Sequence, residues 1–253
     1  MASDRADADA RDEDTSGGEA VGGAEGEKTS WTLIERAASG GREEREAFAR
    51  RYLPIVERYL GSRWARSALS RELADATQEV FVECFQGVLA RADRSRGLAF
   101  RGYLFGVTRN VAARHEAAHA MRRLTPAESA VLAAIPSREA EVSQVFERAW
   151  AESIVDEARR RLEARAEALS EAAQRRVEVL RSRFAGGESM EDIATRLGIT
   201  TKRAYKDFEA AREDFRSCLR DVVRQQAASD APEGIDPMVV DDECRRVLML
   251  VTS

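Results

Sequence analysis

The chain has 253 residues, of which 43% are hydrophobic and 34% charged, which is enough for one large domain or two small ones. No apolar run approaches the roughly 18 residues that a membrane span needs, and the N-terminus lacks the apolar core of a signal peptide. We therefore expect a cytoplasmic protein with no membrane partner. The three cysteines, Cys84, Cys218 and Cys244, are too scattered for a disulfide framework or a zinc site.

The net charge of −5 is distributed unevenly along the chain. Residues 1–30 contain nine acidic and three basic side chains, so they account for −6 and residues 31–253 for +1. This first segment has almost no large apolar side chains, and we predict a disordered acidic arm there. The net acidity of the whole chain therefore does not exclude nucleic-acid binding by the remainder.

Beyond residue 30 the apolar residues recur every three or four positions, and no alternating strand pattern is present. This pattern predicts an all-α protein of two small helical domains joined by a linker. Ser70 is the predicted N-cap of the second helix, and Pro54 either kinks the first helix or sets its start. The first domain, residues 31–123, is expected to contain three helices, at 44–65, 70–90 and 100–123, with a loop at 91–99.

Pro126 and Pro136 mark residues 124–138 as the linker between the two domains. Residues 227–253 form a predicted acidic tail that ends in a short apolar element. The second domain, residues 139–226, contains four predicted helices, at 139–168, 170–185, 189–197 and 201–220.

The sharpest local pattern lies at residues 189–212 and predicts a helix-turn-helix. Ser189 and Thr200 are suitable N-caps for two successive helices, and Gly198 permits the left-handed turn between them. A helical hairpin that only packs against the rest of the domain is the alternative interpretation.

Three cations, Lys202, Arg203 and Lys206, cluster at the start of the second helix of this unit. A helix that docks in the major groove of DNA contacts the DNA with this end. Residues 189–216 contain six basic and six acidic side chains, so we expect this unit alone to bind DNA weakly.

The predicted helix at 100–123 contains five arginines and one acid, together with three aromatic side chains. Basic and aromatic residues together suit a surface that holds a nucleic-acid backbone and stacks on unpaired bases. For Phe100 and Phe105 the alternative is a place in a packed core.

The same helix contains the sequence H-E-x-x-H at His115, Glu116 and His119, which in metalloproteases binds zinc and supplies a general base. These are the only two histidines of the chain, and nothing marks one of the nearby acids (Glu128, Glu139 or Glu141) as a third ligand. We therefore expect no metal, no cofactor and no enzymatic activity, and a zinc hydrolase is the weakest of three functional hypotheses.

Three segments resemble, in the same order, conserved segments of the extracytoplasmic-function (ECF) class of bacterial sigma factors. Residues 73–85, LADATQEVFVECF, are similar to the family's helix of form D-x-x-Q-E-x-F-x-x-x-W. Residues 100–115, FRGYLFGVTRNVAARH, are similar to F-x-x-W-L-x-x-I-A-R-N-x-A-x-D-H, which gives His115 an ordinary place and makes the zinc motif a coincidence. Residues 169–212 resemble the family's fourth domain, with its G-x-S-x-x-E-I-A-x-x-L-G-I-S sequence.

The resemblance implies that residues 31–123 are sigma domain 2 and that residues 139–226 are sigma domain 4. The partners it implies are core RNA polymerase, promoter DNA and, in some members, an anti-sigma factor. Polymerase would be bound through Asp75, Gln78 and Glu79. The resemblance further implies that residues 92–99 and the following helix melt the minus-ten element. The DNA-binding residues would be Arg101, Tyr103, Arg109, Asn110, Arg114, Lys202, Arg203 and Lys206.

The predicted recognition helix departs from the family, because Tyr205, Asp207, Glu209 and Ala210 stand where the family usually has basic residues. A helix-turn-helix regulator that never meets polymerase is therefore the second hypothesis, although it leaves residues 73–86 unexplained. The acidic arm and tail lie outside the family core, and both are expected to compete with DNA for the basic helix at 100–123.

Overall fold

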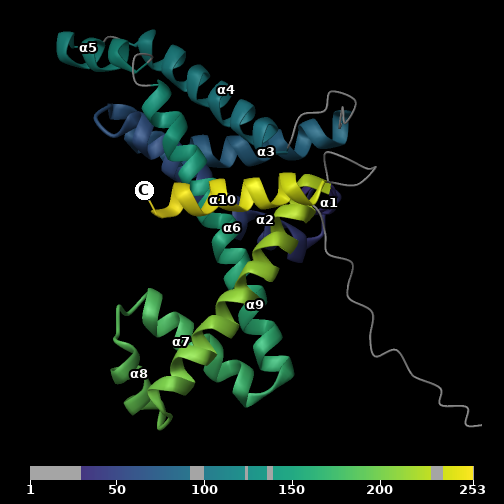
Figure 1. Cartoon of the computed structure of the whole chain (residues 1–253). Helices are drawn as coiled ribbons and strands as arrows, with labels where there is room; N and C mark the ends of the chain where they lie inside the picture. The colour runs from purple at the N-terminus through teal and green to yellow at the C-terminus, as the bar shows by residue number, and fades with distance from the viewer. Residues whose placement is uncertain (1–29, 92–99, 123–124, 136–138, 229–235, 253) are drawn as a thin grey trace, which may run out of the picture.

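The computed structural model describes residues 30–91, 100–122, 125–135, 139–228 and 236–252, and these residues form helices and contain no strand (Figure 1). The predicted all-α class is therefore confirmed, whereas the predicted arm at 1–30 and the loop at 91–99 lie almost entirely outside the described residues. None of the described helices is both long and apolar enough to cross a membrane. The elements are α1 (Ser30–Ala38), α2 (Arg42–Trp64), the 3-10 helix η1 (Ala68–Glu72), α3 (Leu73–Arg91), α4 (Phe100–Ala120), α5 (Pro126–Ala134), α6 (Glu139–Leu169), α7 (Glu171–Phe184), α8 (Met190–Leu197), α9 (Thr201–Ala228) and α10 (Pro237–Thr252).

The apolar stripe predicted near the start of the chain is one buried face of α2. Phe48, Tyr52, Ile55 and Tyr59 are all buried there. Pro54 lies on the exposed side of the same helix, and it does not set the start of the helix, which begins at Arg42. Because Pro54 is exposed while Tyr52 and Ile55 on either side of it are buried, the packed face of α2 continues through this position.

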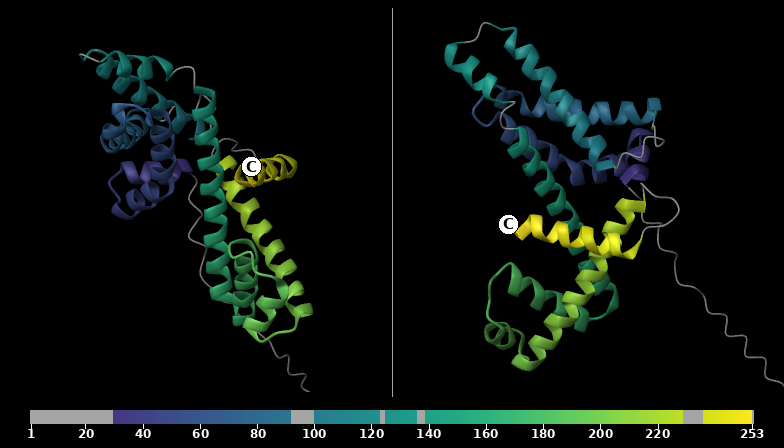
Figure 2. Two further views of the ribbon diagram at one scale, coloured as in Figure 1. Left: turned by 90° about the vertical axis from the view of Figure 1, so that its left-hand side faces the viewer. Right: turned by 45° about the horizontal axis from the view of Figure 1, so that its top comes forward.

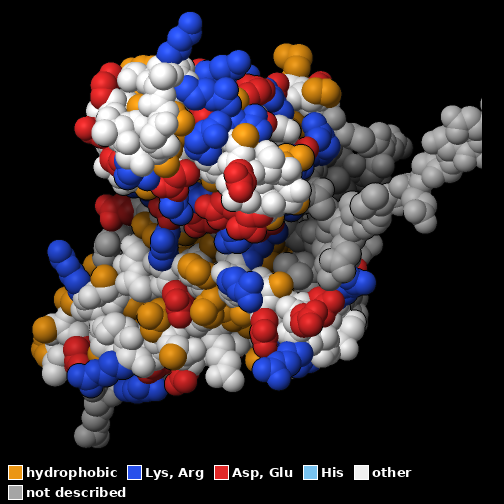
Figure 3. Space-filling view, turned by 90° about the horizontal axis from the view of Figure 1, so that it is seen from below, with side chains coloured by type: hydrophobic (Ala, Val, Ile, Leu, Met, Phe, Trp, Pro, Cys, Tyr) orange, Lys and Arg blue, Asp and Glu red, His pale blue; other side chains and the backbone are white. Residues whose placement is uncertain are grey.

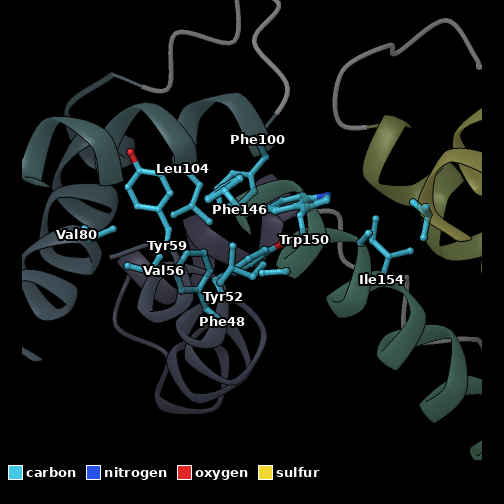
Figure 4. Packing of buried hydrophobic residues seen from close by; sticks show 14 of the residues in the cluster. Phe48, Tyr52, Val56, Tyr59, Val80, Phe100, Leu104, Phe146, Trp150 and Ile154 are labelled. Carbon is cyan, nitrogen blue, oxygen red and sulfur yellow. The ribbon is translucent and has the colours of Figure 1, made fainter. Parts of the chain in front are cut away.

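The long helix α6 connects the parts of the molecule that the sequence pattern divides into two domains (Figure 2). Near its start, the ring of Trp150 stacks on Tyr52 of α2 at a centroid distance of 5.7 Å, and Phe146 meets Tyr59 of the same helix at 6.1 Å. Figure 4 shows these rings together with Phe100. Further along, α6 buries Ile154, Val155, Ala158 and Leu162 in the same cluster as Cys218, Leu219, Val222 and Val223 of α9. One hydrophobic core is therefore continuous across the boundary predicted at 124–138.

Two local predictions in this part of the chain were wrong. Ser70 does not cap α3, because η1 precedes that helix and Ser67 caps η1 by accepting a hydrogen bond from the Leu69 N–H. The predicted linker contains the helix α5, which starts at Pro126 with Thr125 as its N-cap. The hydroxyl of Thr125 accepts from the Glu128 N–H, and the Glu128 carboxylate accepts from the Thr125 N–H at 2.8 Å. The predicted linker thus contains a reciprocal capping box with proline at the first helical position.

A second, smaller core lies at the other end of the molecule, where α7, α8 and the start of α9 meet. Its buried members are Val179, Met190, Ile193, Ala194 and Ala204, with Leu197, Ile199 and Phe208 packed against them. As predicted, Ser189 caps α8, and Ser170, where a helix was expected to start, caps α7. Among the described residues this core is separate from the larger one, and in it the α8 end of α9 packs against α7 and α8.

The predicted C-terminal tail contains the regular helix α10, which lies across α6 and α9 (Figure 1). Its residues Val240, Cys244 and Val247 are buried in the main core, and Leu250 and Val251 pack against that core. The apolar element predicted at the chain end is therefore the last turns of an amphipathic helix rather than the end of a tail. The spacing 240, 244, 247 and 251 is the i, i+4, i+7, i+11 pattern of one helical face.

We predict that Phe146→Ala lowers the free energy of unfolding by about 3–5 kcal/mol, because it removes a fully buried ring that contacts α2 and α4. Urea denaturation followed by circular dichroism measures this loss. Phe184→Ala is the matched control, because the Phe184 side chain is 72% exposed and its loss should cost less than about 1 kcal/mol. A variant in which only part of the helical signal shifts to lower urea would contradict the continuous core.

Candidate nucleic-acid interface

The turn between α8 and α9 has the geometry that a close pair of helices requires. Gly198 adopts φ +64° and ψ 32°, in the left-handed region, and the Ile199 N–H donates to the Ala194 carbonyl at 3.0 Å. The Thr200 hydroxyl accepts from the Arg203 N–H at 3.2 Å and so caps the next helix. These contacts agree with the roles predicted for Gly198 and Thr200, and they let α9 begin directly after α8.

Four side chains on the first two turns of α9 are exposed: Lys202, Arg203, Tyr205 and Lys206. Neither lysine forms an ion pair within the described part of the chain, so both ammonium groups are available to an external anion. The chain has only three lysines in total, and two of them stand here. We call Lys202, Tyr205 and Lys206 the α9 tip.

Arg203, the third predicted DNA-binding cation of α9, has a different environment. Its guanidinium pairs with Asp207 at 2.9 Å, and Asp207 is only 2% exposed. Arg175 of α7 pairs with the other oxygen of the same carboxylate, also at 2.9 Å. Arg203 therefore neutralises a buried acid of its own helix, while Arg175 ties α7 to α9 through the same carboxylate. Arg203 is consequently less available to a phosphate than the two lysines.

Farther along α9 the exposed charges cancel one another. Arg212 pairs with Glu209 at 2.9 Å, and Arg216 pairs with Glu213 at 3.1 Å, each within one turn of the helix. Figure 3 shows basic and acidic side chains intermixed over the face that includes this end of the molecule. Residues 189–216 were predicted to bind DNA weakly because their six basic and six acidic side chains balance. In the structure, some of these opposite charges also pair directly with their neighbours on the helix.

The arginines predicted to make the 100–123 helix basic are held by acids from other helices. Arg101 pairs with Glu147 at 3.3 Å and with Glu243 at 3.5 Å. Each of the four arginines described in 100–122 has such a partner: Arg109 pairs with Glu139, Arg114 with Glu79 and Glu83, and Arg122 with Glu72. The surface of α4 is therefore much less positive than its sequence indicates. Asn110 is exposed on the same helix.

Tyr103, a predicted DNA contact, is engaged inside the protein, where its hydroxyl donates to the Cys84 carbonyl at 3.2 Å. The hydroxyl also lies so close to Gly87 that a Cβ at that position would approach it to 2.5 Å. Burial raises the pKa of Tyr103 above its usual value. In this arrangement Tyr103 joins α4 to α3, and stacking on a base would require it to leave this site.

The glutamate of the H-E-x-x-H sequence is held by side chains of α2. Glu116 accepts from Arg63 at 2.6 and 3.1 Å and from the Trp64 indole N–H at 2.9 Å. Arg63 is itself buried and also donates to Glu139 and to the Tyr59 hydroxyl. No group of three or more His, Cys, Asp or Glu side chains in the described part of the chain is arranged to hold a metal ion.

This buried network around Arg63 joins α2, α4 and α6 by polar contacts. Burial alone would lower the pKa of Arg63, but its hydrogen bonds to Glu116 and Glu139 outweigh burial and raise it. Burial raises the pKa of Tyr59 to about 12. No local sequence pattern indicates this network, because Glu116 and Glu139 lie about 50 to 80 residues from their partners on α2.

The three residues predicted to bind polymerase have unequal exposure. Asp75 and Gln78 are exposed on one face of α3, whereas Glu79 is half-buried against α4. Glu79 accepts from Arg114 at 2.7 Å and contacts Nε2 of His115 at 2.9 Å. The open part of the predicted docking surface is therefore Asp75 and Gln78.

His115 bridges two carboxylates, because its Nδ1 also lies 2.9 Å from Glu72. Burial alone would lower the pKa of His115, but the hydrogen bonds to Glu72 and Glu79 outweigh burial and raise it. The hydrogen bond with His115 lowers the pKa of Glu72, and hydrogen bonds with Arg114 and His115 lower that of Glu79. In its protonated form His115 therefore joins α4 to both η1 and α3.

Comparison with known proteins adds no identification. A scan against protein-family models found no matching family, and a search of the curated proteins found no matching sequence.

We predict that His115→Gln lowers stability more at pH 6 than at pH 9. The raised pKa of His115 means that its contribution is complete below the unfolded value of about 6.5 and is lost as the pH rises through the folded value. The loss at pH 6 should be about 1–3 kcal/mol, as for other hydrogen bonds to charged groups. Urea denaturation of both proteins at the two pH values measures it.

Arg122→Gln is the control, because Arg122 pairs with the same Glu72 and stays charged at both pH values. Its cost should be equal at pH 6 and pH 9. An equal cost for His115→Gln at the two pH values would contradict the charged bridge.

Proposed function

We propose that this protein is a sigma factor of the ECF class, which binds core RNA polymerase and directs it to promoters. The single observation that carries the proposal is the α8–α9 pair, whose α9 tip is exposed and presents two unpaired lysines beside a tyrosine. Support also comes from the order of the three resembling segments, which form α3, α4 and the α7–α9 unit.

In the proposed mechanism, α8 and α9 act as a helix-turn-helix, and the first turns of α9 enter the major groove of the promoter. Lys202 and Lys206 would bind phosphates, and Tyr205 would contact base edges or sugar. The acids farther along α9 are already paired with arginines, so they repel the DNA backbone less than their number indicates.

In the same mechanism, Asp75 and Gln78 of α3 bind the polymerase, while Arg109 and Asn110 of α4 face the melted strand. The arginines of α4 would exchange their carboxylate partners for phosphates, because pairs this exposed cost little to break. Affinity for DNA would then depend on the polymerase, which holds the α4 surface and the α9 tip on one promoter at high effective concentration.

The alternative is a DNA-binding regulator that acts without polymerase through the α9 tip alone. The pairing of all four described arginines of 100–122 favours this alternative, because α4 then offers few free cations. The exposed Asp75 and Gln78 on α3 favour the sigma factor, because a regulator that acts without polymerase does not need a polymerase-binding surface there.

We predict that Asp75→Ala combined with Gln78→Ala weakens binding to core RNA polymerase at least tenfold and leaves the fold intact, because both side chains are exposed. Co-purification and fluorescence titration with core polymerase measure the change. The matched control is Asp156→Ala with Gln144→Ala, which removes the same two side-chain types from exposed positions on α6. Equal affinity of the two double variants for core polymerase, or no polymerase binding by the unchanged protein, would contradict the sigma-factor proposal.

We predict that Lys202→Ala combined with Lys206→Ala lowers the salt dependence of promoter binding by the polymerase complex. The log–log slope should fall by about two, at roughly 0.9 for each phosphate that the lysines no longer neutralise. Filter binding over a range of salt concentrations measures the slope.

Arg42→Ala combined with Arg245→Ala also removes two exposed positive charges, but far from the α9 tip, and it should leave the slope unchanged. If the two double variants have the same slope, the α9 tip does not bind DNA.

A further inference from the structure

Four charged side chains from three helices form a closed ring in which basic and acidic groups alternate. Arg101 of α4 lies 3.3 Å from Glu147 of α6 and 3.5 Å from Glu243 of α10. Arg246 of α10 completes the ring, at 3.0 Å from Glu147 and 3.8 Å from Glu243. The ring contains two positive and two negative charges, so Arg101 carries no unbalanced charge while the ring is closed.

The helix α10 supplies half of this ring and is anchored on two further elements. Its Val240, Cys244 and Val247 are buried against the core that α6 and α9 share. Its Asp241 accepts from Arg220 of α9 at 2.7 Å. As Figure 1 shows, α10 lies across α6 with α3 and α4 on one side and α7 and α8 on the other. One helix therefore joins the α4 surface to α9.

The ion pairs that α10 makes in the ring are weaker than the packing of its buried face. The ring residues are partly exposed, so water and salt compete with each ion pair, and a phosphate group competes in the same way. The outer face of α10, which includes Met238, Asp242 and Met249, is exposed. A polyanion that reaches Arg101 therefore competes with a single carboxylate from α10 and one from α6.

We propose that α10 is an intramolecular clasp whose Glu243 occupies Arg101 in place of a nucleic-acid phosphate. In the closed state the clasp restrains α4 and α9 and lowers the affinity of the α4 surface for nucleic acid. Phosphate binding to Arg101 opens the ring and loosens α10. The inference rests on the proposed function only in assigning nucleic acid as the ligand of α4.

The test compares Glu243→Lys with Asp242→Lys in the full chain. Both substitutions change the charge of α10 by the same amount at adjacent positions, but among the described residues Asp242 pairs with Arg245 of α10 itself. Fluorescence anisotropy with a labelled 20-nucleotide single-stranded DNA measures affinity, and amide hydrogen exchange measures the opening of α10. We expect Glu243→Lys to bind about threefold tighter or more than Asp242→Lys, with the ratio shrinking at high salt. We also expect its α10 amides to exchange faster.

A milder pair, Glu243→Gln and Asp242→Asn, repeats the comparison without adding a cation, so that misfolding of the lysine variant does not decide the result. Equal affinity within both pairs, including no binding by any variant, overturns the clasp. Neither pair alters α3, so core-polymerase binding is measured on the same proteins. Polymerase binding with equal DNA affinities would overturn only the clasp, whereas DNA affinities in the expected order without polymerase binding would overturn only the sigma-factor proposal.

Discussion

The packing of α6 is the constraint on which the rest of the structure depends. Phe146 and Trp150 at one end of this helix lie among the aromatic rings of α2 and α4, and Ile154 and Leu162 farther along pack with α9. Because a single 31-residue helix makes both contacts, the exposed face of α3 and the α9 tip are positioned by the same rigid element. Any function that uses both surfaces on one partner must either match this spacing or break contacts that involve α6.

Electrostatics in this protein is mainly a matter of pairing between helices. Arginine dominates the basic residues, and its planar guanidinium suits two-oxygen contacts such as that of Arg63 with Glu116. Arg101 and Arg114 are likewise used to join helices, although their sequence context indicates a basic surface. The positive charge that remains for an outside ligand is consequently a small part of the positive charge in the sequence.

Features set by neighbouring residues were predictable from the sequence, and features set by distant residues were not. The caps at Ser189 and Thr200 and the left-handed turn at Gly198 depend on contacts within four residues, and all of them are present. The helix α5 was missed although Thr125 and Glu128 have capping-box spacing, because prolines on both sides of a short segment also indicate breaks. The partners of Arg101 lie 46 and 142 residues away, so no local pattern marks them. The core that α6 and α10 share was not predicted for the same reason, because its residues are far apart in the sequence.

The scarcity of lysine has a chemical consequence for the α9 tip. Primary amines occur in this chain only at Lys28, Lys202, Lys206 and the α-amino group, so acylation with an amine-selective reagent is nearly site-directed. Such a modification removes both charges of the tip, because an acylated lysine is neutral. Every ion pair described between helices uses arginine or histidine and is untouched by the reaction. The molecule thus separates two kinds of cation, one that holds the fold and one that can be neutralised without disturbing it.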